Sequence, residues 1–96
     1  MDREEALGLL NAKLDEYRKM SYVELSAKIG REDFLEVVGA SGTEYQIEIQ
    51  ICWDHKPDGD VRVMGAIDDG TFRGAFKPVC SDLIVRPDDH DLDGEP

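Results

Sequence analysis

The chain is poor in several residue types that mark broad protein classes. Its 96 residues contain two cysteines, too few for a disulfide framework. No apolar run approaches the roughly 20 residues that cross a bilayer, and the N-terminus lacks the basic-then-apolar order of a signal peptide. Bases are also scarce, since 11 lysines and arginines stand against 22 aspartates and glutamates. We therefore expect a cytoplasmic protein that binds neither membranes nor nucleic acid, because its charge repels phosphate.

The length fits one domain, and the charge is concentrated at one end. The net charge is −11, and residues 88–96 contribute five carboxylates, no base and a single leucine. Such a segment buries too little surface to offset its ordering entropy. We expect one domain over residues 1–87 followed by a disordered acidic tail. Residues 89–94 resemble the opening of an EF-hand loop, but the chain ends before the glutamate such a loop needs, so calcium is not expected.

The first thirty residues show a helical period. Apolar side chains recur at helical spacing at these positions: Leu7, Leu10, Leu14 and Tyr17. This spacing predicts an amphipathic helix over about residues 3–19. Asp2 with Glu5, and Ser21 with Glu24, each match the capping box that opens a helix. The second box predicts a further short helix that ends near residue 30.

The rest of the chain changes to a period of two. Over residues 43–53 the large apolar side chains all share one parity: Tyr45, Ile47, Ile49, Ile51 and Trp53. This alternation predicts a strand with one buried and one wet face. Weaker patterns predict strands at 33–38, 61–67 and 71–76, with a short fifth at 83–85. The fold expected is α+β, with one or two N-terminal helices packed on one face of a four- to five-stranded antiparallel β-meander.

The turns suggest a register. Asp69-Gly70 has the composition of a type I′ hairpin turn, which would place Gly65 opposite Gly74. Pairing Trp53 with Val61 would bring the large apolar residues of the neighbouring strands to the same face, and a slip of one residue would expose them. The other face would then carry acids on the second strand and arginines on the third and fourth, at positions 62 and 73. We expect these to form cross-strand charge pairs.

Two glycines facing each other on a buried sheet face invite two interpretations. Gly65 and Gly74, close to Trp53, could form the floor of a groove for a ligand. Alternatively, the leucine-rich helix approaches the sheet closely there, or the indole folds over the gap. We favour close packing, because glycine in a strand commonly marks it.

No residue set predicts catalysis, a metal site or a cofactor. The aspartates of residues 54–60 and 68–69 belong to turns that lie at opposite ends of a meander, so they should not converge. Cys52, His55, Cys80 and His90 lack the spacing of a zinc site. Cys52 with His55 also lacks the third group that orients a nucleophile and its base. The glycines lack the strand–loop–helix context of a phosphate cradle.

About half of the chain resembles a small bacterial domain family of unknown function. The similarity lies in turn and strand residues between positions 45 and 88: Trp53-Asp54, Arg62-Val63, Ile67-Asp68-Asp69-Gly70, Pro78, Ser81-Asp82-Leu83-Ile84 and Pro87-Asp88. The resemblance implies a shared fold and no activity, cofactor or catalytic residue.

Two functional hypotheses of different class follow. The first is a non-enzymatic interaction or regulatory module that binds another protein with a basic surface, steered by charge. The second is a small-molecule-binding domain or accessory subunit with an apolar cavity between helix and sheet, near Gly65, Gly74 and Trp53. An exposed edge strand could also pair two copies of the chain into a homodimer.

Overall fold

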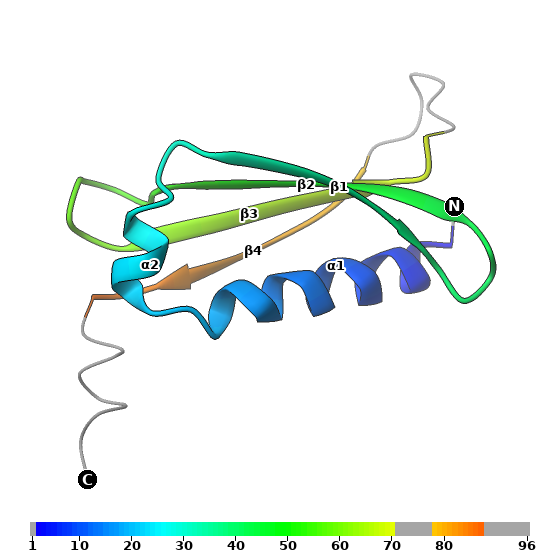
Figure 1. The fold of residues 1–96 in the computed structure, drawn as a ribbon, viewed down its shortest axis with the longest axis horizontal. Coiled ribbons are helices and arrows are strands. Elements are labelled where there is room, and N and C mark those ends of the chain that lie inside the picture. The colour runs from blue at the N-terminus through cyan, green and yellow to red at the C-terminus, as the bar shows by residue number, and fades with distance from the viewer. Residues whose placement is uncertain (1, 71–77, 88–96) are drawn as a thin grey trace, which may run out of the picture.

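Two helices precede four strands in the computed structural model, which describes residues 2–70 and 78–87. The elements are α1 (Arg3–Arg18), α2 (Tyr22–Ser26), β1 (Glu32–Val38), β2 (Glu44–Trp53), β3 (Val61–Asp68) and β4 (Val79–Val85). The strands form one antiparallel sheet in the order β1-β2-β3-β4, with α1 running along one side of it (Figure 1). The predicted α+β meander with N-terminal helices on one face is confirmed.

The two helix starts differ in how they are capped. Ser21 caps α2 with a full capping box, in which its hydroxyl and the Glu24 side chain each accept from the other's backbone N–H. Asp2 caps α1 by accepting from the Glu5 N–H at 3.1 Å, but the Glu5 carboxylate does not return. It accepts instead from the Tyr45 hydroxyl at 2.7 Å. The first expected box is therefore only half formed, because a hydroxyl on β2 takes the carboxylate.

The Glu5 carboxylate joins the start of α1 to the turn between β1 and β2. It accepts from the Ser41 backbone N–H at 2.9 Å and from the Ser41 hydroxyl at 2.7 Å, besides Tyr45. These donors stabilise the carboxylate and lower the pKa of Glu5. The hydrogen bond to Glu5 is the largest cause that raises the pKa of Tyr45, and desolvation is the second; together they raise it to about 12. One glutamate thus fixes the helix start to the sheet.

Two further tyrosines tie the helical segment to the strands. The Tyr17 hydroxyl, at the end of α1, donates to the Asp33 carboxylate of β1 at 2.7 Å. Desolvation and this hydrogen bond raise the pKa of Tyr17. The Tyr22 hydroxyl of α2 donates to the Gly59 carbonyl in the β2–β3 connection, also at 2.7 Å. Periodicity alone does not reveal these hydrogen bonds. One signal is present in the sequence: Asp33 shares the parity of apolar Leu35, which places the Asp33 side chain on the inward face of its strand.

The register of β2 against β3 is the predicted one. Ile47 pairs with Ile67, Ile49 with Gly65, Ile51 with Val63, and Trp53 with Val61. The core that this register creates combines one face of α1 and Leu25 of α2 with three strands. Its buried residues are Ala6, Leu10, Leu14, Tyr17, Leu25, Tyr45, Ile47, Ile49, Ile51, Val61, Val63, Ile67, Val79, Leu83 and Val85. Leu7, expected in the apolar stripe, is 39% exposed, and Ala6 contributes to the core instead.

The expected pairing partner of β3 is wrong. β3 pairs with β4, and Gly65 lies opposite Ser81, so the expected pairing of Gly65 with Gly74 does not form. The predicted strand at 71–76, with Gly74, lies outside the described residues, and the predicted fifth strand at 83–85 is the end of β4. A type I′ turn needs a positive φ at both central residues. Among the described residues other than glycine, only Asp58 has one, so Asp69-Gly70 is not such a turn.

No helix in the described ranges is both long enough and apolar enough to span a membrane.

Candidate functional site

The residues of the expected groove are not brought together in the described part of the chain. Gly65 is buried beneath α1, where an added Cβ would lie 2.7 Å from Leu10 Cδ1 and 3.4 Å from Leu14 Cδ2. Trp53 pairs with Val61 at the far end of β2, four pairs away from Gly65. Gly74 lies outside the described residues. The close approach of α1 accounts for a glycine at position 65, and leucine side chains fill the space above it.

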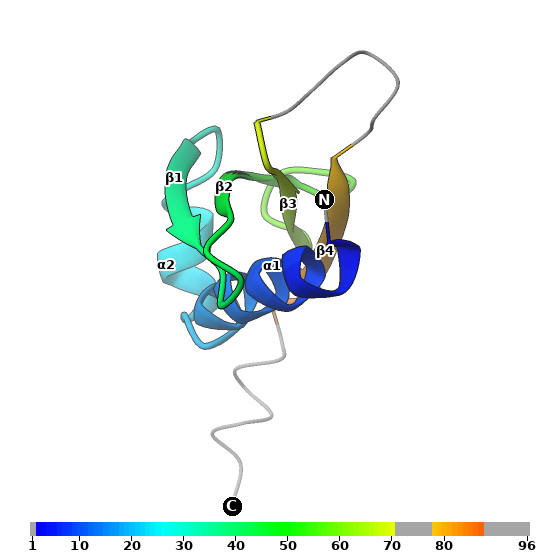
Figure 2. The ribbon, with the colours of Figure 1, turned by 90° about the vertical axis from the view of Figure 1, so that its right-hand side faces the viewer.

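No described helix covers the opposite face of the sheet. α1 packs under β3 and β4 on one side, as the end-on view shows (Figure 2). The alternate residues of each strand project to the other side, which we call the open face. In the described strands these residues are Glu32, Phe34, Glu36 and Val38 of β1, Glu44, Gln46, Glu48, Gln50 and Cys52 of β2, Arg62, Met64, Ala66 and Asp68 of β3, and Cys80, Asp82 and Ile84 of β4.

Large apolar side chains of the open face are exposed. Phe34 is 70% exposed, Val38 65% and Ile84 47%. Scattered exposed apolar residues are normal in soluble proteins. Here, however, Phe34 adjoins a hollow in the same face, so exposure and shape coincide.

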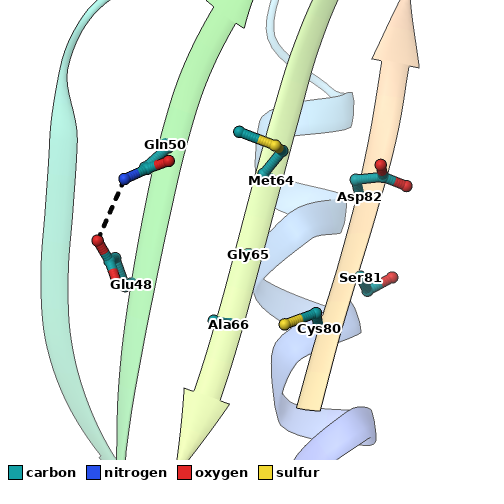
Figure 3. Close-up of a pocket in the computed structure, with 8 residues that line it drawn as sticks. All are labelled: Glu48, Gln50, Met64, Gly65, Ala66, Cys80, Ser81 and Asp82. Carbon is teal, nitrogen blue, oxygen red and sulfur yellow. Dashed lines mark hydrogen bonds between the residues drawn. The ribbon is translucent and has the colours of Figure 1, made fainter. Parts of the chain in front are cut away.

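Two hollows on the open face lie side by side and share two lining residues. The first has a volume of about 390 Å³ and lies over β2, β3 and β4 (Figure 3). The second, of about 550 Å³, extends over β1 to Phe34. Glu48 and Ala66 line both hollows. The register aligns these residues in one row across the strands, Phe34–Glu48–Ala66–Cys80, and we call the hollow along this row the trough. Gly65 contributes to its floor from the opposite face of β3.

Carboxylates surround the trough. Glu32 and Asp82 lie in the row on one side of it, and Glu36 and Asp68 border the other side. Glu48 stands within it. A neutral amide, Gln50 Nε2, donates to Glu32 at 2.7 Å and to Glu48 at 3.3 Å, so this contact leaves both negative charges in place.

Arg62 lies on the open face as predicted, but its partners differ from the expected ones. Its Nε donates to Asp82 on β4 at 2.9 Å, and its Nη1 lies 3.6 Å from Asp54, which follows β2. The hydrogen bond to Asp82 raises the pKa of Arg62. The expected pairing with acids of β2 is thus replaced by a pairing with β4. Position 73 lies outside the described residues.

The remaining candidates for chemistry stay apart. Cys52 and Cys80 are free thiols on the open face, and they pair with different residues of β3, Arg62 and Ala66. His55 is exposed, with its Nε2 3.3 Å from Asp54. In the described ranges, no group of three or more His, Cys, Asp or Glu residues is placed to hold a metal ion. His90 lies outside those ranges.

The class defined by the described residues is an α+β domain with one helix-covered sheet face and one open, acidic face whose trough is lined by both apolar and polar side chains. No family model matches the chain, and neither a curated protein nor a solved structure does. The assignment of a candidate site therefore rests on the geometry of the open face alone.

Proposed function

We propose that this chain is a non-enzymatic protein-interaction module of the bacterial cytoplasm, and that its open face binds a partner with a basic surface. The observation that carries the proposal is the trough itself, where exposed Phe34 and half-buried Met64 lie among carboxylates. The resemblance to a bacterial domain family supports the setting, and the composition supports the sign of the partner's charge.

Burial and charge would act together at this face. Fully burying an exposed side chain such as Phe34 contributes about 1.5–3 kcal/mol. Carboxylates around an apolar centre attract a basic partner over distance and repel other acidic surfaces. Such an arrangement gives affinity at the centre and selectivity at the rim. It also disfavours close approach of two copies through this face, since both carry the same charge.

The alternative hypothesis placed a small ligand between helix and sheet. Leu10 and Leu14 occupy that space at Gly65, so no observation in the described residues favours it.

A labelled peptide tests the proposal. The probe is a peptide of about 14 residues built from leucine and lysine at helical spacing, with its binding followed by fluorescence anisotropy at low and high salt. We expect binding that weakens as salt rises, because the carboxylates of the open face are exposed. Phe34→Ser should weaken binding roughly tenfold, since 1.4 kcal/mol corresponds to a factor of ten.

The matched control is Val23→Ser. Val23 is 74% exposed on α2 and lies outside the open face, so its loss should leave binding unchanged. Equal weakening by both substitutions, or binding that ignores salt, would contradict the proposal.

A further inference from the structure

The trough crosses the strands instead of following them. Its row, Phe34–Glu48–Ala66–Cys80, takes one residue from each strand. At its centre is Ala66, whose side chain ends at one methyl group. The longer Met64 side chain stands on one side of it, as Figure 3 shows. The two hollows that meet at Glu48 and Ala66 together extend across all four strands, and we call this path the channel.

The length of this channel across the strands matches a short helix. Strands lie about 4.8 Å apart, so four strands extend over about 14 Å. A helix rises 1.5 Å per residue, so about ten residues cover this width. Such a helix presents apolar residues at i, i+3, i+4 and i+7 along one face, which is the pattern that apolar grooves bind.

The charges on the two sides select the composition of that helix. Glu32 and Asp82 lie on one side of the channel, and Glu36 and Asp68 on the other. Asp82 already pairs with Arg62, so the strongest attraction should come from the other three. A helix with lysine or arginine on both flanks of its apolar stripe would complement both rows, with its aliphatic stems over the trough. Anionic lipid would be repelled by the same carboxylates, which favours a protein segment.

An extended segment fits the face less well. It would add to the outer edge of β1 or β4, where its backbone could pair. In either place it would leave Ala66, on the inner strand β3, uncovered. From the direction of the trough, its length across the strands and its charge, we infer that the open face binds a short basic amphipathic helix of the partner, lying across the strands with an apolar side chain over Ala66. This inference rests on the proposed function, since it specifies the segment that the open face holds.

Two peptides of identical composition test the inference. Both contain about 14 leucines and lysines, one arranged with the helical period and one with strict alternation, which favours a strand. We expect the helical-period peptide to bind at least about tenfold more tightly, a difference of 1.4 kcal/mol. Ala66→Lys should weaken it by at least about tenfold, because a lysine there both fills the channel and repels the peptide.

A second variant and a control guard against misfolding of the first. Gln46→Lys changes an exposed residue beside the trough, and we expect it to weaken the helical-period peptide severalfold. Val23→Lys adds the same charge on α2 and should have little effect. Melting curves recorded by circular dichroism establish that each variant is folded.

The outcomes separate the two proposals. Tighter binding of the alternating peptide, or equal binding of both peptides, would overturn the helix inference. In that case, weaker peptide binding by Phe34→Ser would still support the open face as the binding surface. If neither peptide binds, or if Val23→Lys weakens binding as much as Ala66→Lys and Gln46→Lys do, both proposals fail.

Discussion

The fit between α1 and β3 at Gly65 allows a stability prediction worked from distances. A Cβ at this position would lie 2.7 Å from Leu10 Cδ1 and 3.1 Å from Ile49 Cδ1. Side chains or the helix must therefore shift, and overpacking of this kind costs about 1–3 kcal/mol. Replacing glycine with alanine also stabilises by about 0.4–1 kcal/mol through the unfolded chain. We expect Gly65→Ala to lower the free energy of unfolding by about 1–2 kcal/mol, or several degrees in Tm.

Gly8→Ala provides a control, because it should change the free energy of unfolding in the opposite direction. Gly8 lies in α1 with no atom within 4 Å of an added Cβ. Alanine is the better helix former by about 0.8–1.0 kcal/mol, so this substitution should raise stability. Urea unfolding followed by the fluorescence of the single tryptophan, Trp53, measures both variants.

A double-mutant cycle identifies the cause. Leu10→Ala alone should cost about 2–5 kcal/mol, because it leaves a cavity under the helix. In the double variant the Cβ at position 65 enters that space, so the combined cost should fall short of additivity by about 0.5–3 kcal/mol. Additive costs, or a stabilising Gly65→Ala, would refute the close approach of α1.

Three further predictions concern the contact between Tyr45 and Glu5 and the N-cap of α2. The raised pKa of Tyr45, about 12, means that its contribution to stability is fully present below about pH 10 and is lost as the pH rises through 12. Ultraviolet titration of the phenols should show late ionisation, and Tyr45→Phe should reduce its amplitude by one tyrosine while Tyr17 still ionises late; an unchanged late amplitude in Tyr45→Phe would contradict the Glu5 contact. The lowered pKa of Glu5 has the opposite sign, so its contribution is present above about pH 4.5 and is lost as the pH falls through the lowered value. Glu5→Gln should flatten this part of the acid unfolding profile, and an unchanged profile would argue against the tie. Ser21→Ala should cost about 1 kcal/mol in urea unfolding, because it removes the N-cap of α2; a cost near zero would show that α2 depends on packing alone.

The sequence predicts one hairpin of this fold well and the next one badly, for a physical reason. Ile47, Ile49 and Ile51 share a parity so strictly that a slip of one residue against β3 would expose all three. Beyond β3, two segments in succession offer strand patterns, and Asp69-Gly70 has the composition of a turn that would choose the first. The choice depends on what α1 covers, and Val79, Leu83 and Val85 fill that space. Local composition does not contain this long-range information.

The candidate site was also predictable from the sequence only in part. Alternation alone places Glu48, Met64 and Ala66 on the second face of the sheet. It does not reveal that none of the described helices covers this face, that Arg62 pairs with Asp82, or that the small side chain of Ala66 lines both hollows. These features depend on the side on which α1 packs and on which strand follows β3. The sequence therefore predicted the members of the face without predicting its role.

The central claim is that the open face, and not the helical side, receives a basic partner. The chain contains three methionines, of which Met64 borders the trough and Met20 packs against the core beyond the end of α1. The most direct measurement labels the methionine methyl groups with ¹³C and titrates the helical-period peptide while NMR spectra are recorded. We predict a saturable shift of the Met64 methyl signal with Met20 unmoved. Movement of Met20 with Met64 fixed, or no shift at saturating peptide, would contradict the account.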